Sequence, residues 1–278
     1  MRCSHSTKTE SVVVPRRRLD AELVRRSLAR SREQAVELIA DGRVKVQGNI
    51  ATKPATQVED NVSIVVMSDE ADFGYVSRGA HKLAGALDVW PDIAVAGKRC
   101  LDAGASTGGF TDVLLRRGAD HVVAVDVGYG QLAWSIQSSD RVEVVDRTNV
   151  RTLTSEQIGG VVDLVVADLS FISLTLVLPA LVGCCSTTAD VVVMVKPQFE
   201  VGKEALGTGG VVRDPAQRAA AVSTIADSAF ALGWGVRGVT ASVLPGPAGN
   251  VEYFLWLGHG APALNPSDLD RAIEEGPS

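Results

Sequence analysis

The sequence predicts an α/β protein in which helices sandwich a parallel sheet with an antiparallel last strand, preceded by a small α+β unit. Three observations predict this. The 278 residues are 46% apolar and 22% charged, a globular composition with room for two domains. From residue 98 onward, strand-length apolar runs alternate with helical segments. Residues 1–66 carry 12 Lys and Arg against 8 Asp and Glu, whereas the remainder carries 15 against 25, so a basic module that captures a polyanion precedes an acidic one.

The first unit is expected to contain two helices and a short β segment. Apolar residues recur at helical spacing from Leu19, and a second helix is expected to open at Ser31 with a capping box. Residues 44–47 alternate as a strand does, and Gly48-Asn49 is expected to form the turn that follows. The expected divisions are a disordered tail at 1–15, a domain at 16–66, a linker at 67–78, a larger domain at 79–260, and a tail or short helix at 261–278.

Basic side chains crowd this first unit, and guanidinium groups in such density suit phosphate oxygens. Those expected to hold phosphates are Arg16, Arg17, Arg18, Arg25, Arg26, Arg30, Arg32, Arg43 and Lys45. The stretch 16–58 resembles the S4 domain, an RNA-binding fold. The resemblance rests on Arg18-Leu19-Asp20, Ser31-Arg32, Ala35, Ile39, Gly42 and Val44 to Gly48. It implies RNA binding and no reaction.

The larger domain is expected to alternate strand and helix. Strands are expected at 99–103, 121–126, 142–145, 161–167, 191–195, 236–243 and 251–257, and helices at 110–117, near Gln131, from Leu174, and from Asp214 to about Leu232. Asp214 and Pro215 suit the N-cap and first turn of the last helix. The turn Pro245-Gly246-Pro247 is too short for a parallel crossover, so the last two strands are expected to form an antiparallel hairpin.

The first strand of this domain leads into a glycine-rich turn, residues 102–110. It departs from G-x-G-x-x-G, because the next glycine after Gly104 comes four positions later, at Gly108, which argues against a dinucleotide. Asp126 ends the next strand, where a carboxylate can accept ribose hydroxyls, and Asp146 ends the third, where it can meet adenine. The pattern resembles the S-adenosylmethionine site of Rossmann-fold methyltransferases. The residues expected to bind this cofactor are Gly104, Ser106, Thr107, Gly108, Gly109, Phe110, Asp126 and Asp146.

Four charged residues are candidates for catalysis. Lys82 precedes the first strand of the larger domain, Asp168 and Lys196 follow two later strands, and Glu252 opens the last strand. Methyl transfer to a ribose 2′-hydroxyl needs a base, and a lysine can serve if burial or a second cation disfavours its charged form. Lys196 is the expected base, helped by Lys82 and held by the two carboxylates.

These four residues occur in the order of the K-D-K-E tetrad of the FtsJ-like RNA ribose 2′-O-methyltransferases. An S4 domain followed by an FtsJ-like domain resembles the TlyA family, over nearly the whole chain from Arg16 to Leu257. The resemblance implies an S-adenosylmethionine-dependent rRNA (cytidine-2′-O)-methyltransferase that acts on ribosomal subunits. One departure lies in the linker, where Phe73-Gly74-Tyr75-Val76 replaces an Arg-x-Trp-Val pattern of mycobacterial relatives, which leaves a coupling role for the linker open.

Two other functions are alternatives: a membrane-active hemolysin, as some family members are labelled, and a nicotinamide-dependent oxidoreductase, which the sheet and Asp126 would also fit. The longest nearly apolar run, 174–185, has 12 residues, whereas a bilayer span needs about 20. The chain start lacks the apolar run of a secretion signal, so we expect a cytoplasmic protein without stable membrane insertion. The four cysteines form no C-x-x-C pair, so neither a disulfide framework nor a metal site is expected.

Overall fold

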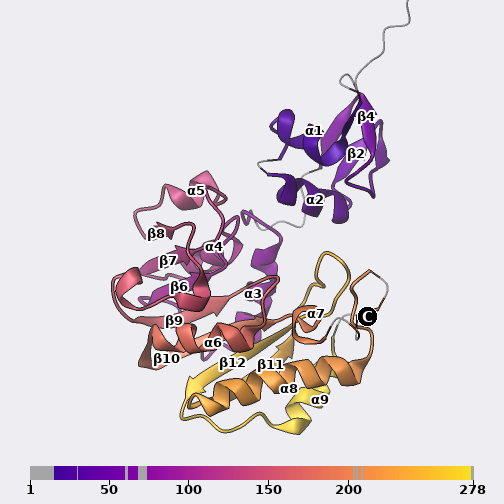
Figure 1. The fold of residues 1–278 in the computed structure, drawn as a ribbon. Helices are drawn as coiled ribbons and strands as arrows, with labels where there is room; N and C mark the ends of the chain where they lie inside the picture. The colour runs from indigo at the N-terminus through magenta and orange to yellow at the C-terminus, as the bar shows by residue number, and fades with distance from the viewer. Residues whose placement is uncertain are drawn as a thin grey trace, which may run out of the picture. The chain divides into compact units, whose positions relative to one another are not determined.

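The computed structural model describes residues 16–29, 31–59, 62–67, 74–202, 204, 206–207 and 209–276. The chain divides into two compact units, residues 1–71 and 72–278 (Figure 1). The expected tail at 1–15, together with Arg30 and Phe73, lies outside the described residues.

The first unit is a small α+β domain with two short sheets. Its elements are β1 (Arg16–Arg18), α1 (Leu19–Arg25), α2 (Arg32–Ala40), β2 (Val44–Val46), β3 (Asn49–Ile50), β4 (Gln57–Glu59) and β5 (Ile64–Val66). Strand β1 pairs antiparallel with β4, and β2 lies between β3 and β5. Leu19, Leu23, Ile39 and Val44 pack in its core. Ser31 caps α2 by accepting a hydrogen bond from the Gln34 amide, as its sequence predicts.

Two local features of this unit differ from expectation. The hairpin turn is formed by Gln47 and Gly48, with φ of +50° and +81°, and Asn49 already belongs to β3. A two-residue hairpin turn of this kind needs positive φ at both central positions, which places the turn one residue earlier. Three consecutive arginines also form β1, because β4, distant in sequence, supplies its hydrogen-bonding partner.

The second unit is built on a seven-stranded sheet. Its strands are β6 (Arg99–Ala103), β7 (His121–Val125), β8 (Val142–Val145), β9 (Val162–Ala167), β10 (Cys185–Val195), β11 (Trp234–Ala241) and β12 (Tyr253–His259). Their order is β11-β12-β10-β9-β6-β7-β8. The pairs from β10 to β8 are parallel, and β12 is antiparallel to both of its neighbours. The predicted parallel sheet with an antiparallel last strand is confirmed.

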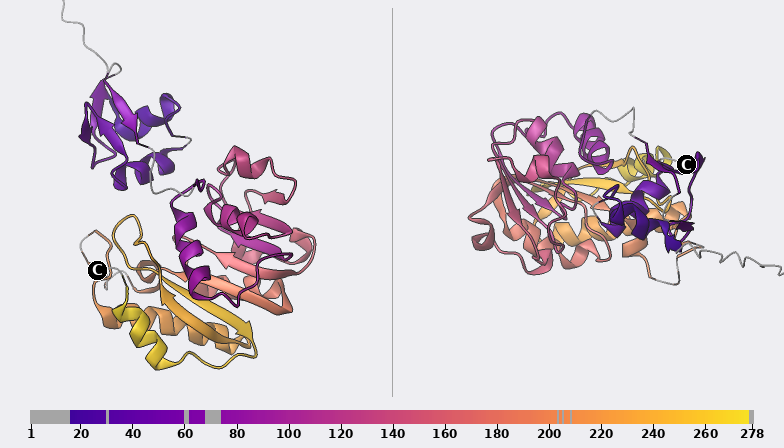
Figure 2. Two further views of the ribbon diagram at one scale, coloured as in Figure 1. Left: turned by 180° about the vertical axis from the view of Figure 1, so that it is seen from behind. Right: turned by 90° about the horizontal axis from the view of Figure 1, so that it is seen from above.

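Helices cover both faces of this sheet. They are α3 (Gly79–Val89), α4 (Gly109–Arg116), α5 (Trp134–Gln137), α6 (Leu178–Gly183), α7 (Pro197–Glu200), α8 (Pro215–Ala231) and α9 (Pro266–Glu274), with 3-10 turns at η1 (Val150–Thr152), η2 (Glu156–Ile158) and η3 (Leu174–Leu176). One core joins α3, α4 and α5 to the sheet, and the other joins α6, α8 and α9. Helix α8 lies in front of the sheet in Figure 1. In the left view of Figure 2, which shows the opposite side, α3 lies in front of the sheet. Alternate strand residues point to opposite cores, since Val192 belongs to one and Val193 to the other.

Several elements differ in extent from the sequence prediction. The stretch from Leu174 opens as a 3-10 turn before α6 begins, and the helix expected near Gln131 starts at Trp134. Strand β10 begins at Cys185, six residues before the expected start at Val191, and its register shifts between Cys185 and Asp190. The sequence did not indicate this early start, because residues 186–190 are mostly polar. Helix α8, in contrast, begins as predicted: Asp214 is its N-cap and accepts a hydrogen bond from the Ala216 amide, and Pro215 is in its first turn.

Candidate active site

The glycine-rich turn after β6 is pressed against its neighbours. Gly104 and Gly108 have φ of +87° and +93°, and Gly108 is the N-cap of α4. A Cβ on Gly104 would lie 2.4 Å from the backbone oxygen of Asp168, and one on Gly109 would lie 2.2 Å from Ser77 Oγ. Only glycine fits at these positions, so the turn leaves bare backbone at the carboxyl end of the sheet.

Two carboxylates at the following strand ends are held by backbone amides. Asp126 accepts from the Ser106 amide at 2.8 Å and from the Gly128 amide at 2.6 Å, one through each oxygen. Asp146 accepts from the Gly130 amide at 2.8 Å. Both side chains are half-buried. A carboxylate oxygen can accept two hydrogen bonds, so each group keeps capacity for a ligand hydroxyl or amine.

Three other predicted cofactor residues, Ser106, Thr107 and Phe110, differ in exposure and in the contacts that they make. Ser106 is exposed and has a positive φ of +47°, and the Thr107 carbonyl accepts from the Ala133 amide. The Phe110 ring is buried, with its centroid 6.2 Å from that of Phe254. Phe110 therefore offers a ligand only its backbone.

Asp102, at the start of the same turn, was not among the predicted site residues. Its side chain is fully buried, and Thr111 Oγ1 donates to Oδ2 at 2.6 Å while Oδ1 has no hydrogen-bond partner. Burial raises the pKa of the Asp102 carboxyl to about 7, although the Thr111 hydroxyl opposes this rise. A buried acid with an unsatisfied oxygen beside the turn fits a cationic ligand group.

The four predicted catalytic residues form two ion pairs. Lys82, on α3, lies with Nζ 2.6 Å from Glu252 Oε2, and their side chains are 9% and 1% exposed. Glu252 lies one residue ahead of β12. A Cβ on Gly246 would come within 2.6 Å of Glu252 Oε1, so the glycine of the hairpin turn leaves room for this carboxylate.

The second ion pair joins the ends of two neighbouring strands. Lys196 Nζ lies 2.5 Å from Asp168 Oδ1 and donates to Ser170 Oγ at 3.0 Å. Val195 is the residue opposite Tyr253 in the register of β10 and β12, so Lys196 and Glu252 follow one step beyond this pair at the same edge. The sheet thus places Asp168, Lys196 and Glu252 at the ends of β9, β10 and β12.

A further carboxylate, Glu200, was not among the predicted site residues. It connects the segment that follows Lys196 to the segment that follows Asp168. Glu200 accepts from Ser173 Oγ at 2.5 Å and from the Leu174 amide at 2.9 Å. Burial raises the pKa of the Glu200 carboxyl, and the Ser173 hydroxyl counteracts this rise. The glutamate therefore ties the segment after β10 to the segment after β9, although no spacing in the sequence pointed to this contact.

An exposed aromatic ring stands in the loop that follows Asp168. Phe171 is 91% exposed and has a φ of +64°, which is rare for a bulky residue. Its ring centroid lies 5.1 Å from that of Phe199. Strained backbone that holds an apolar ring in solvent indicates a functional position.

The described part of the linker packs on α4. The Val76 amide donates to Asp112 Oδ2 at 2.9 Å, and the Arg116 guanidinium lies 4.5 Å from the centre of the Tyr75 ring. The Tyr75 ring also meets His81 edge to face at 5.3 Å. Residues 74–76 are thus attached to the helix that begins at the glycine-rich turn.

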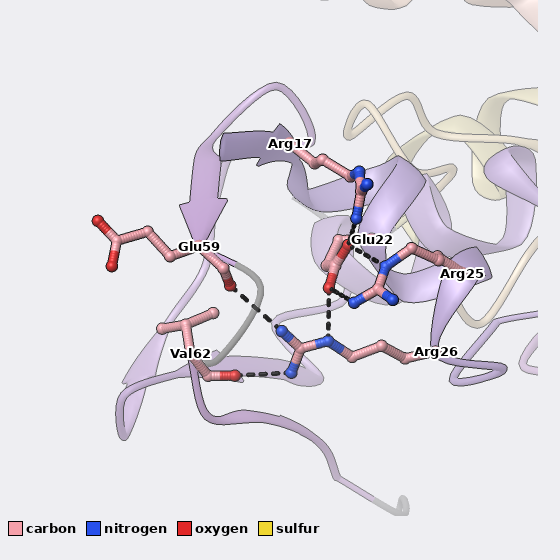
Figure 3. A network of polar contacts seen from close by, with 6 residues as sticks. All are labelled: Arg17, Glu22, Arg25, Arg26, Glu59 and Val62. Carbon is pink, nitrogen blue, oxygen red and sulfur yellow. Dashed lines mark hydrogen bonds and ion pairs between the residues drawn. The ribbon is translucent and has the colours of Figure 1, made fainter. Parts of the chain in front are cut away.

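In the first unit, the predicted phosphate-binding residues group around acidic side chains. Arg16 pairs with Glu59, and Arg18 and Arg32 both pair with the buried Asp20. Arg43 donates to the Met67 carbonyl. Lys45 is on β2, and Arg30 lies outside the described residues. Three others, Arg17, Arg25 and Arg26, surround Glu22 (Figure 3).

Comparison with known proteins assigns the chain to a family. Residues 75–259 match the FtsJ-like methyltransferase family, and residues 17–64 match the S4 domain. The chain is 63% identical to a 16S/23S rRNA (cytidine-2′-O)-methyltransferase TlyA of Mycobacterium tuberculosis, over 94% of this chain and 99% of that protein. It is 34% identical to a protein named Hemolysin A of Brachyspira hyodysenteriae, over 85% of this chain and 97% of that one.

A solved structure agrees. A Streptococcus thermophilus protein described as a hemolysin superposes with a TM-score of 0.74 at 34% identity, covering 95% of this chain and 96% of that one. Across the described residues, no helix has the length and apolar character needed to cross a bilayer. The chain therefore belongs to the TlyA family of methyltransferases, in which an S4 domain precedes an FtsJ-like methyltransferase domain.

Proposed function

We propose that this protein transfers a methyl group from S-adenosylmethionine to the 2′-hydroxyl of a cytidine in ribosomal RNA, with ribosomal subunits as the substrate. The observation that carries the proposal is the pair of lysine–carboxylate contacts at the carboxyl edge of the sheet, directly beside the glycine-rich turn. The family match favours methyl transfer over the oxidoreductase alternative.

The turn and the strand ends fit the proposed cofactor. Bare backbone at Gly104, Gly108 and Gly109 permits close approach of a nucleoside, and Asp126 can accept the ribose hydroxyls. Asp146 would face the adenine, and the unsatisfied oxygen of Asp102 suits the cofactor's ammonium group. When bound, the cofactor supplies a methyl group on a positively charged sulfur.

The two ion pairs have different roles in proton transfer: one contains the proposed base, and the other affects its charge. The 2′-hydroxyl oxygen forms the new bond to the methyl carbon, the carbon–sulfur bond breaks, and the hydroxyl proton must pass to a base. Lys196 is the proposed base, and it must first lose its own proton. Asp168 favours its ammonium form, whereas a second cation at Lys82 disfavours it. Glu252 neutralises much of the Lys82 charge, so the positive charge of the bound cofactor would be needed to favour the neutral form of Lys196.

Features of both units support an RNA substrate. The S4 domain is an RNA-binding domain and carries the arginines described above. In the second unit, the exposed Phe171 ring offers a stacking face close in sequence to Asp168, and base stacking on aromatic rings is a common way to hold an unpaired nucleotide. The relative with 63% identity is named for cytidine in 16S and 23S rRNA, which is the reason for proposing this nucleotide. We therefore also propose a cytoplasmic location, where ribosomal subunits are found.

The test is single-turnover methylation of purified ribosomal subunits with radiolabelled S-adenosylmethionine, followed by mapping of 2′-O-methyl groups. Lys196→Ala and Lys196→Arg should both abolish methylation while cofactor and RNA still bind, because guanidinium cannot act as a base. Lys98→Ala is the matched control, since Lys98 also forms an ion pair, with Asp190, but precedes β6 at the other end of the strand. Substantial activity of Lys196→Arg would contradict the assignment of the base.

A further inference from the structure

Glu22, on the first helix of the S4 domain, is a buried glutamate that lies among three arginines from β1, α1 and the end of α1. The Glu22 side chain is fully buried, and Arg25 donates to both of its oxygens, at 2.8 and 2.6 Å. Arg26 Nε donates to Oε1 at 2.6 Å, and Arg17 Nη1 lies 3.8 Å from Oε2 (Figure 3). We call these four residues the Glu22 cluster.

The cluster stays positive despite its acid. Hydrogen bonds, mainly from Arg25, lower the pKa of the Glu22 carboxyl to about 2, although burial opposes this decrease. The carboxylate is therefore ionised at neutral pH, and three guanidinium groups outweigh it by two charges. An anionic partner still meets net positive charge.

The three arginines differ in what else they contact. Arg26 is the most buried, and its remaining nitrogens donate to the Val62 carbonyl at 2.6 Å and the Glu59 carbonyl at 3.3 Å. It braces α1 against the segment between β4 and β5. Arg17 and Arg25 keep 44% and 45% of their side-chain surface exposed while the glutamate holds one edge of each.

We propose that Glu22 is a positioning residue for RNA binding, which holds Arg17 and Arg25 in fixed orientations as a paired site for backbone phosphates. The inference rests on the proposed function, since it assumes that the S4 domain binds RNA. Free arginine side chains lose several rotatable bonds when they bind a phosphate, and each such ordering weakens binding. Ordering by Glu22 before RNA arrives removes that cost.

This role predicts an effect opposite in sign to simple charge counting. Removing an acid from a basic surface should tighten RNA binding through electrostatics alone. If Glu22 orders two arginines, Glu22→Gln should instead weaken binding, by about 5-fold or more when two side chains must be ordered. Glu59→Gln is the matched control, because Glu59 and its partner Arg16 are both exposed and their contact should contribute little to ordering.

The experiment measures the Kd of the full chain for a fluorescein-labelled RNA hairpin by anisotropy, over a range of salt concentrations. We expect weaker binding for Glu22→Gln with an unchanged salt slope, since the number of phosphate-binding cations is the same. Glu59→Gln should bind as tightly as the parent or more tightly. Binding by Glu22→Gln as tight as that of the parent would overturn the inference. Failure of the parent itself to bind would overturn the proposed function instead.

A double-mutant cycle separates positioning from loss of fold. In an Arg17→Ala/Arg25→Ala background, Glu22→Gln should no longer weaken binding, because the side chains that it acts through are gone. An equal loss in both backgrounds would show a merely structural role. Amide NMR spectra report whether the S4 domain stays folded. If Glu22→Gln unfolds it, Arg25→Lys decides, since this variant keeps the charge but cannot form the two-nitrogen contact, and parental affinity would then refute the proposal.

Discussion

Asp102→Asn should change how the stability of the second unit depends on pH. In the folded protein burial raises the pKa of this carboxyl to about 7, against an ordinary value of 3.8 for an exposed aspartate. Between these values the folded state binds a proton that the unfolded state has lost. Stability contributed by the protonated acid is therefore complete below pH 3.8 and is lost as the pH rises to 7.

The magnitude follows from the size of the pKa difference. Each pH step of one corresponds to about 1.4 kcal/mol, so raising the pH from 5 to 7 should remove roughly 2 kcal/mol of unfolding free energy through this group alone. Asparagine cannot ionise, so the variant lacks this loss. Its amide also places an unpaired donor where Oδ1 stands, a cost of about 1–3 kcal/mol that does not depend on pH.

Urea unfolding followed by tryptophan fluorescence measures this effect. All four tryptophans, Trp90, Trp134, Trp234 and Trp256, belong to the second unit, so the signal reports on that unit within the full chain. The parent-minus-variant difference in unfolding free energy should fall steadily from pH 5 to 7 and level off above the pKa.

A difference that stays constant with pH would refute the reasoning, because it would mean that Asp102 titrates alike in both states. Thr111→Val is a control that should shift the pKa of Asp102 upward. It removes the hydroxyl whose hydrogen bond lowers the pKa of Asp102, so the decline should extend to higher pH.

Three further predictions concern binding. Asp126→Ala should weaken S-adenosylmethionine binding at least tenfold by calorimetry, since each charge-assisted hydrogen bond is worth about 1.5–3 kcal/mol; an unchanged affinity would place the ribose elsewhere. Phe171→Ala should slow single-turnover methylation of subunits without changing cofactor affinity, and parental rates would exclude a stacking role. Deleting residues 16–66 should abolish the salt-dependent part of RNA binding and leave cofactor binding intact, whereas loss of cofactor binding would contradict separable roles.

The sequence was sufficient for the order of the elements and for much of the candidate site. Strand-length apolar runs and turn residues placed β6 to β9 within a residue or two, and the short turn at Pro245-Gly246-Pro247 predicted the antiparallel hairpin. These features are local, because alternation and turn chemistry depend on neighbouring residues. Strand ends of a parallel sheet share one edge, so residues that follow them, such as Asp168 and Lys196, could be expected to meet.

The tertiary structure alone decided which charges pair and which are buried. Lys82 meets Glu252 across 170 residues, a contact that depends on how α3 packs against the sheet. Glu22 looks like a surface acid on a basic helix, yet it is fully buried among arginines. Arg26, a predicted phosphate ligand, also donates to the Val62 and Glu59 carbonyls, contacts that the sequence did not indicate. Periodicity reports the face on which a residue lies, but the partners of a buried charge come from distant segments. Ionic contacts of this kind are therefore set by the packed chain, because only packing brings together the groups that replace water around each charge.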